Sequence, residues 1–320
     1  MLSDISTRDS SASLGMTFFC YPQFYFTTAR MFISGFTIIR NAVINDYPIV
    51  EAIRSILPVV DEMVVSVGDS DDDTEGLIRS IDSPKIRIVH STWDPALRKG
   101  GAVLAAETDK AFAQISPEAD WAFYIQADEV VHEQYHAAIR KACKQHLHDP
   151  EVDGLLFDYT HFYGTYDYVG DSRRWYRREV RIVRNDKAIR SYRDAQGFRR
   201  EGEKLRVKPA HASVYHYGWV KSPQQMLTKI KNLDSLWDEG RAPEQHPLAA
   251  AEAFNFDDYD SLRRFEGTHP AVMQARVHRQ NWQVEIDVTR KHFKLKNRVL
   301  HWIEQLTGKR LFEYRNYRLV

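Results

Sequence analysis

The stretch WAFYIQADEVV, residues 121–131, decides the fold that this sequence predicts. Its first five residues are apolar, and an unbroken run of this length is typical of a strand that is buried on both faces. The run stops at Gln126, and two carboxylates, Asp128 and Glu129, follow directly. Burying a carboxylate is costly unless it is paired, hydrogen-bonded or bound to a metal ion. The stretch therefore predicts a buried strand that ends in acidic side chains, with Glu129 either a second ligand or an exposed neighbour.

The segments around this stretch alternate between strand and helix patterns from Met31 onward. Strands are expected at 36–39, 63–67, 86–89 and 121–125, and helices at 47–57, 74–81 and 101–115. Such alternation is typical of a parallel sheet with helices on its faces. The sequence thus predicts an α/β fold with a Rossmann-like, mostly parallel sheet flanked by helices, followed by a helical C-terminal extension.

Polar residues follow each of the predicted strands. Arg40 and Asn41 follow the first strand, Asp69 the second, Asp94 the third and Asp128 the fourth. Ligands of open parallel sheets bind at the C-terminal ends of the strands, so these side chains are expected to share a cleft. No GxGxxG motif and no P-loop lysine motif is present. A bound diphosphate therefore needs another counter-charge, and a divalent cation held by carboxylates is the obvious one.

The composition is that of an ordinary globular protein. The chain has 320 residues, 43% hydrophobic and 28% charged, which suits one large domain or two small ones. Its 44 basic and 44 acidic residues balance, so nucleic acid is not an expected partner. Cys20 and Cys143 show no metal-binding spacing and fit a reducing compartment. No apolar run is long enough to predict a membrane-spanning helix, and the expected location is cytoplasmic.

With these features in place, the sequence resembles the family 2 glycosyltransferases, which have the GT-A fold, over roughly residues 33–235. The segment FTIIRNAVINDYPIVEAIRSILPVVDEMVVSVGDSDDDTEGLI looks like the family's opening strand, helix and strand, and WAFYIQADEVV looks like the strand that delivers its DXD motif. The resemblance implies an inverting transfer of a sugar from a nucleotide-diphosphate sugar, UDP-linked by family habit, to an acceptor hydroxyl. It also implies a divalent cation, Mn²⁺ or Mg²⁺, a carbohydrate or lipid-linked acceptor, and a role in cell-surface polysaccharide biosynthesis.

The resemblance assigns roles to residues at the strand ends. Arg40, Asn41 and Asp69 fall where the family contacts the base and the ribose. Asp128 falls on the last aspartate of the DXD motif, which binds the metal ion and the sugar nucleotide. The first aspartate of that motif is Gln126 here, which can hydrogen-bond ribose or phosphate but adds no charge.

The second half of the predicted domain offers a histidine and a base. Residues 211–219 alternate like a strand, and the resemblance implies a late metal-binding histidine, for which His216 is the first choice and His211 the second. A partly buried histidine bonded to the backbone is the alternative for His216. The resemblance also implies a carboxylate base, with Asp194 the first candidate and Asp171 the second. Aspartates in such segments also serve ordinary turns.

Residues 173–184, RRWYRREVRIVR, carry six arginines in twelve residues. Guanidinium groups suit phosphate oxygens, so one interpretation is recognition of a diphosphate or of an anionic acceptor. Contact with nucleic acid is the second interpretation. The third is a strand whose exposed face is basic and solvated.

The C-terminal part resembles no common module. Residues 287–309 are expected to form a helix that stops at Gly308. Its apolar stripe, Leu295, Val299, Trp302 and Leu306, is expected to pack on the catalytic domain. Its basic face offers an alternative, which is a peripheral contact with an anionic membrane at its inner face. The expected domain organisation is a peripheral extension (1–30), a catalytic domain (31–245) and a largely helical extension packed on that domain (246–320).

Two rival functions are left open by the sequence. A sugar-phosphate nucleotidyltransferase could use a similar sheet, although the segment IIRNAVINDYP lacks the glycines usual after the first strand of such enzymes. A nucleotide-sugar-binding protein that has lost catalysis is the other rival. Gln126, in place of an aspartate, is the feature that invites it.

Overall fold

The computed structural model describes residues 30–97, 99–234, 248 and 250–320. The chain divides into two units, Met1–Arg30 and Met31–Val320, and the second unit carries all the elements named below. Residues 1–29 of the expected extension and the expected boundary at residues 245 and 246 lie outside the described residues. None of the helices in the described part of the chain has the length and hydrophobicity that a membrane span requires.

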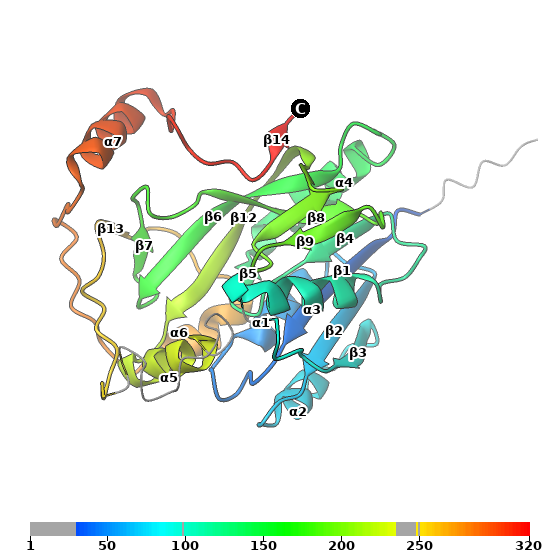
Figure 1. Ribbon diagram of the computed structural model, residues 1–320, viewed down its shortest axis with the longest axis horizontal. Helices are drawn as coiled ribbons and strands as arrows, with labels where there is room; N and C mark the ends of the chain where they lie inside the picture. The colour runs from blue at the N-terminus through cyan, green and yellow to red at the C-terminus, as the bar shows by residue number, and fades with distance from the viewer. Residues whose placement is uncertain (1–29, 98, 235–247, 249) are drawn as a thin grey trace, which may run out of the picture. The chain divides into compact units, whose positions relative to one another are not determined.

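Four parallel strands form one half of the main sheet, in the order β3-β2-β1-β4 (Figure 1). The strands are β1 (Ile33–Ile39), β2 (Glu62–Gly68), β3 (Ile86–Ser91) and β4 (Trp121–Tyr124). The helices between them are α1 (Ile49–Ile56), α2 (Thr74–Arg79) and α3 (Ala102–Phe112), with a 3₁₀ turn at Lys99–Gly101. The predicted α/β class, with a Rossmann-like, mostly parallel sheet flanked by helices, is confirmed.

The central strands are buried along their whole length. Every residue of β1 and of β4 is buried, which is why the sequence shows unbroken apolar runs there rather than an alternation. Helix α1 adds Ile49, Ile53 and Ile56 to the same core from one face. Packing on both faces holds these strands rigidly, so the residues just beyond their ends are held in fixed positions.

An antiparallel half extends the sheet beyond β4. Strand β8 (Arg178–Arg184) pairs antiparallel with β4, and β6 (Gly154–Gly164) pairs antiparallel with β8. Strand β12 (Arg206–Val220) then runs parallel to β6. A short strand, β5 (Glu129–Val131), pairs antiparallel with β12 and sets Glu129 opposite His216. This register places the segment after β4 beside the middle of β12, although the two are far apart in the sequence.

The other elements surround this sheet. Helices α4 (His136–Gln145) and α5 (Pro223–Asp234) and strand β7 (Tyr168–Gly170) precede residue 235. A small separate sheet consists of β9 (Ile189–Tyr192), β10 (Gly197–Arg200) and β11 (Glu203–Lys204). The C-terminal elements are β13 (Leu262–Arg264), α6 (Gln274–His278), α7 (Leu295–Thr307) and β14 (Arg318–Leu319). Further 3₁₀ turns lie at Glu133–Tyr135 and Ala271–Met273.

The segment after residue 250 packs on the sheet with less helix than expected. Strand β13 pairs with β7 and β14 pairs with β12, which ties this segment to the sheet at two places. The helix expected over 287–309 begins only at Leu295, because the carboxylate of Asp287 accepts hydrogen bonds from the backbone and hydroxyl of Thr289 and forms a turn instead. The helix stops at Gly308 in a left-handed conformation, as predicted.

Helix α7 turns its apolar stripe to solvent, and Figure 1 shows this helix at the periphery of the unit, away from α1, α2 and α3. The four stripe residues, Leu295, Val299, Trp302 and Leu306, are all exposed. The expected packing of this stripe on the catalytic domain is therefore wrong. The physical reason is that the opposite face of the helix carries Glu304, which pairs with arginines of the domain.

Candidate functional site

A cavity of about 600 Å³ lies at the C-terminal ends of β1 and β4. The cavity brings together six of the seven residues that were the first choices for the site, all except Asp69, and they come from separate parts of the chain. They are Arg40 and Asn41 after β1, Gln126 and Asp128 after β4, Asp194 between β9 and β10, and His216 in β12. Helix α5 adds Lys229 to the wall. The edge of the sheet where ligands were expected therefore holds a cavity that these polar and charged side chains line.

Hydrogen bonds from side chains join the residues that follow β1 to those that follow β2. Arg40 Nε donates to the backbone carbonyl of Asp69 at 2.6 Å. Asn41 donates to the carboxylate of Asp71 at 3.0 Å and accepts from the Asp71 backbone at 2.7 Å. The exposed side chain of Asp69 does not line the cavity, whereas Asp71 does. The acidic residue of this segment that lines the cavity is thus Asp71, two residues beyond the predicted Asp69.

Asp128 forms an ion pair with a lysine that the sequence did not indicate. Its Oδ2 lies 3.0 Å from Lys229 Nζ, which also donates to the carbonyl of Gly218 at 2.8 Å. Burial alone would raise the pKa of Asp128, but the charge and hydrogen bond of Lys229 outweigh it and hold this pKa well below its usual range. Asp128 is therefore ionised at neutral pH.

Two histidines form a chain of hydrogen bonds behind Asp128. His161 Nε2 lies 2.8 Å from the backbone carbonyl of Tyr176, which can only accept, so this nitrogen carries the proton. Burial lowers the pKa of His161 to about 3, so its Nδ1 is unprotonated and accepts from His216 Nδ1 at 3.1 Å. Burial also lowers the pKa of His216. The remaining nitrogen of neutral His216, Nε2, therefore presents a lone pair, 3.6 Å from Asp128 Oδ1.

This arrangement fits the protein's share of a divalent-cation site. A lone pair and a carboxylate oxygen converge with no proton between them, which is unfavourable until a cation joins them. Divalent ions bind such ligands at about 2.0–2.2 Å, so two atoms this far apart can reach one ion. Among the described residues, no cluster of three or more metal-binding side chains exists. Asp128 and His216 would thus hold the ion together with oxygens of a bound ligand and water.

The backbone makes this close approach possible at Gly218. A Cβ at this position would lie 2.7 Å from both Asp128 Oδ2 and His216 Nε2. A side chain at this position would force Asp128 or His216 to shift, so glycine leaves room for the two side chains to approach each other. The carbonyl of the same residue accepts from Lys229, which fixes the ammonium beside the carboxylate.

A second buried lysine adds positive charge to the site. Lys221 is almost fully buried, and burial together with the charge of Lys229 lowers its pKa to about 7. It donates to the backbone carbonyl of Asp46, and the ammonium groups of Lys221 and Lys229 lie 5.4 and 5.0 Å from the ring of Tyr47. Cations held this way over an aromatic face favour an anionic ligand in the neighbouring cavity.

Glu129 is neither a second ligand nor an exposed neighbour, which corrects both interpretations. Its carboxylate is fully buried and forms a two-pronged ion pair with the equally buried Arg181, at 2.8 and 2.7 Å. Tyr159 donates to it at 2.7 Å, and the backbone of Gln126 donates at 3.1 Å. The group does not line the cavity. It fixes the turn that presents Asp128.

The two candidate bases lie in different surroundings. Asp194 lines the cavity between Arg193 and Ala195, both of which have a positive φ, and its carboxylate has no hydrogen bond or ion pair within the described part of the chain. Gln126 Nε2 donates to the carbonyl of Ala195 at 3.3 Å and so holds this turn against the end of β4. Asp171 lies outside the cavity and pairs with Lys291 at 2.9 Å. Of these two candidates, Asp194 is therefore the one that lines the cavity with a carboxylate that has no partner among the described residues.

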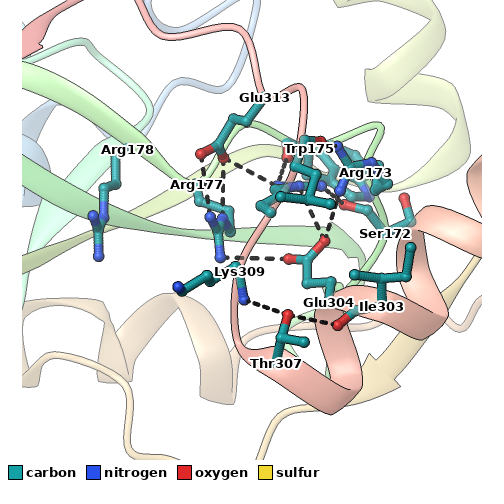
Figure 2. Close-up of polar contacts among 12 residues, drawn as sticks. Ser172, Arg173, Trp175, Arg177, Arg178, Ile303, Glu304, Thr307, Lys309 and Glu313 are labelled. Atoms are coloured by element: carbon teal, nitrogen blue, oxygen red, sulfur yellow. Dashed lines mark hydrogen bonds and ion pairs between the residues drawn. The ribbon is translucent and has the colours of Figure 1, made fainter.

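The arginines of residues 173–184 are engaged in internal contacts, as Figure 2 shows for Arg173 and Arg177. The ion pairs are Arg173 with Glu304, Arg174 with Asp258, Arg177 with Glu313, Arg178 with Asp158, and Arg181 with Glu129. Arg184 donates to backbone carbonyls and lies over the ring of Trp121. Three of the acidic partners belong to the segment after residue 250. The cluster therefore fastens that segment to the sheet, which neither the anion-binding nor the solvated-face interpretation anticipated.

The second choice of histidine, His211, lies in β12 but is exposed and does not line the cavity. His216, five residues further along the same strand, is the one that meets Asp128. The bulges of β12 against β6, between Pro209 and Ser213 and again between His216 and Trp219, set which residues of the strand face the site.

Comparisons with known proteins do not assign a family. No protein-family model and no curated protein matches the sequence. S. aureus TarS is similar in structure, with 16% identity, a TM-score of 0.38, and coverage of 63% of this chain and 39% of that one. Glucosyl-3-phosphoglycerate synthase from Mycobacterium tuberculosis, in complex with Mn²⁺, UDP and phosphoglyceric acid, gives 25% identity, a TM-score of 0.29, and coverage of 42% and 44%.

A third similar structure is 4-diphosphocytidyl-2C-methyl-D-erythritol synthase from Anaerococcus prevotii DSM 20548. It gives 13% identity, a TM-score of 0.36, and coverage of 62% of this chain and 95% of that one. This chain spans less than half the length of the first two structures. Likeness at these TM-scores carries no argument about activity, so function has to be argued from the site itself.

Proposed function

We propose that this protein is a GT-A-type glycosyltransferase that uses a nucleotide-diphosphate sugar as its donor. The observation that carries the proposal is the convergence of Asp128, the free lone pair of His216 and the ammonium of Lys229 in one cavity at the C-terminal edge of the sheet. A carboxylate and an imidazole suit a divalent cation, and two lysines beside them suit a diphosphate. The resemblance to the family 2 glycosyltransferases supports the same assignment.

In this proposal, different residues of the cavity contact different parts of the nucleotide-sugar donor. Arg40, Asn41 and Asp71 meet the nucleoside, and Trp93 adds an aromatic wall near them. Lys229 would hold the diphosphate, and Lys221, which is buried and does not line the cavity, would add positive charge behind it. A divalent cation, Mn²⁺ or Mg²⁺, on Asp128 and His216 would add positive charge against the charge that develops on the leaving diphosphate.

Asp194 is the proposed base. The acceptor oxygen forms its bond to the anomeric carbon of the sugar while the bond from that carbon to the diphosphate oxygen breaks. The proton of the acceptor hydroxyl passes to the carboxylate of Asp194, and the nucleoside diphosphate leaves with the electron pair of the broken bond. Inversion at the anomeric carbon follows from a single displacement of this kind, and its assignment rests on the family resemblance.

The first prediction concerns joint binding of nucleotide and metal. UDP is expected to raise the melting temperature of the protein, and the rise is expected to grow when Mn²⁺ or Mg²⁺ is added, because Asp128 and His216 leave the remaining ligand positions to diphosphate oxygens. Mn²⁺ alone should change the melting temperature little. Differential scanning fluorimetry, with and without EDTA, measures the melting temperature of the protein alone, with UDP, with Mn²⁺, and with UDP and Mn²⁺ together. If EDTA does not change the stabilisation by UDP, the proposed metal site is contradicted. If no nucleoside diphosphate stabilises the protein, the proposed donor is contradicted.

Activity assays separate the proposed function from its two rivals. The protein should hydrolyse its nucleotide sugar slowly without an acceptor, and a screen of nucleotide sugars with UDP release as the readout identifies the donor. Pyrophosphate release from a nucleoside triphosphate and a sugar phosphate would show a nucleotidyltransferase instead. Binding of a nucleotide sugar without hydrolysis or transfer to any acceptor tried would favour a binding protein.

Asp194→Asn is expected to lower kcat for transfer by about a hundredfold, because general-base catalysis contributes at least this much. Asp171→Asn is the matched control and is expected to keep the wild-type kcat, because Asp171 pairs with Lys291 outside the cavity. The UDP-induced shift in melting temperature should stay the same in both variants. An equal loss of kcat in the two variants, or a loss only in Asp171→Asn, would remove Asp194 from the base position.

A further inference from the structure

Helix α7 carries an apolar stripe that nothing in the described part of the chain covers. Leu295, Val299, Trp302 and Leu306 follow one another at spacings of four, three and four residues, which places them on one face of the helix. Their exposed fractions are 76%, 50%, 63% and 66%, and no residue of α7 is buried. Contiguous exposed apolar surface of this kind marks a site of interaction.

The orientation of the helix is fixed from its other side. Glu304 lies two residues after Trp302 and two before Leu306, so it faces away from the stripe. Its carboxylate is paired with Arg173 at 3.0 Å, with Arg177 at 3.4 Å and with Arg310 at 3.4 Å. Figure 2 shows Glu304 directed into this arginine cluster. The ion pairs therefore hold α7 with its apolar stripe turned outward.

Positive charge borders the stripe. Lys296 follows Leu295 by one residue and Arg298 precedes Val299 by one, so they lie on the two sides of the stripe, and Lys294 lies at its start. All three are exposed, and no acidic partner of any of them is found among the described residues. Of the six lysines and arginines in residues 291–310, Lys291 pairs with Asp171 and the buried Arg310 pairs with Glu304, which leaves Lys294, Lys296, Arg298 and Lys309 at the surface. The chain as a whole is neutral, so this charge is a local feature.

We propose that α7 is a docking element for an anionic lipid bilayer and lies in the plane of its surface. The four apolar side chains would enter the boundary between headgroups and acyl chains, with Trp302 at the depth that tryptophan favours. Lys294, Lys296 and Arg298 would meet the anionic headgroups beside them. A helix of thirteen residues is too short to span the bilayer but is sufficient to lie on it.

The charges favour a bilayer over a second copy of this chain. A symmetric dimer through the stripe would bring the basic borders of two α7 helices together and cause repulsion between them. Nucleic acid would match the charge but gives no reason for exposed leucine and valine. The proposal does not rest on the proposed transfer reaction, because its test measures attachment and not activity.

Co-sedimentation with vesicles tests the proposal. The full chain is mixed with vesicles of phosphatidylcholine alone, or of three parts phosphatidylcholine to one part phosphatidylglycerol. Binding to the anionic vesicles is expected to be at least about tenfold tighter than to neutral ones and to weaken as salt is raised. A double substitution, Trp302→Ser with Leu306→Ser, is expected to lower binding by about tenfold or more, since it removes two of the inserted side chains.

Two further variants make the test specific. Lys296→Glu with Arg298→Glu should abolish the preference for anionic vesicles without touching the apolar stripe. Val43→Ser with Ile44→Ser, which changes two exposed apolar residues of the loop after β1, is the matched control and should bind as the wild type does. Circular dichroism and melting temperatures check that all variants are folded.

Each other outcome overturns the proposal. Equal binding of the wild type to neutral and anionic vesicles, or no binding to either, excludes an anionic bilayer as the partner. Unchanged binding in both α7 variants places the contact elsewhere. If light scattering shows a dimer that Trp302→Ser with Leu306→Ser converts to a monomer, and the wild type ignores vesicles, the stripe joins two copies of the chain. Tight binding to nucleic acid with no binding to vesicles would assign the patch to that partner instead.

Discussion

Glu129→Gln is expected to lower the free energy of unfolding by about 3–5 kcal/mol, the usual result of breaking a buried ion pair from one side. The substitution keeps the size of the side chain but removes its charge, and it deprives the fully buried guanidinium of Arg181 of the carboxylate that it pairs with. Tyr159 and the backbone of Gln126 also lose a charged acceptor. Urea unfolding followed by circular dichroism measures the loss.

Two comparisons separate this effect from a general effect of losing a carboxylate. Glu75→Gln removes the partner of Arg79 in an exposed pair within α2 and is expected to cost less than about 1 kcal/mol. Glu129→Met combined with Arg181→Met removes both charges and is expected to recover much of the stability that Glu129→Gln loses, because no buried charge is left alone. A loss below about 1 kcal/mol in Glu129→Gln would mean that water reaches Arg181, contrary to its burial.

The fold could be predicted because its signals are local. An unbroken apolar run such as WAFYI identifies a strand buried on both faces without any knowledge of its neighbours, and alternation with helical patterns then implies parallel pairing. The rule that ligands bind at the C-terminal ends of parallel strands then predicts where the site residues lie. Six of the seven chosen residues line one cavity for this reason.

The partners of charged residues could not be predicted, because they depend on register between distant strands. Glu129 meets Arg181 only because β4 pairs with β8, and it lies opposite His216 only because β5 pairs with β12. Nothing within a few residues of Glu129 distinguishes a buried carboxylate from a solvated one. The same limit applies to His161, whose contact with His216 follows from the pairing of β6 with β12.

The sequence contains a feature from which Lys229 could have been predicted as a site residue. In α5, Met226, Lys229, Ile230 and Leu233 all line the cavity, so a lysine lies within the apolar stripe of that helix. A charged residue on the buried face of a helix needs a partner, which points to an acidic site beneath it. For α7 the opposite limit holds: periodicity identifies an apolar stripe but does not say whether protein or another phase covers it.

Asp128→Asn is expected to lower transfer activity per folded molecule by at least about a hundredfold and up to about a thousandfold. The substitution keeps the shape of the side chain, but it removes one of the two ligands proposed for the cation and the counter-charge of Lys229. It also leaves the buried ammonium of Lys229 beside a neutral amide. We therefore expect the melting temperature of the ligand-free protein to fall, while the protein stays folded at room temperature.

The rise in melting temperature with UDP gives a second readout for this residue. In Asp128→Asn it should no longer grow when Mn²⁺ is added, whereas UDP alone should still stabilise the protein through Lys229 and the residues after β1. Asp158→Asn is the control, because Asp158 forms an exposed ion pair with Arg178 outside the cavity, and it should leave both readouts unchanged. If Asp128→Asn keeps its activity per folded molecule and its response to Mn²⁺, and loses only stability, then Asp128 serves as the structural partner of Lys229, and the proposed metal and donor site has to be given up.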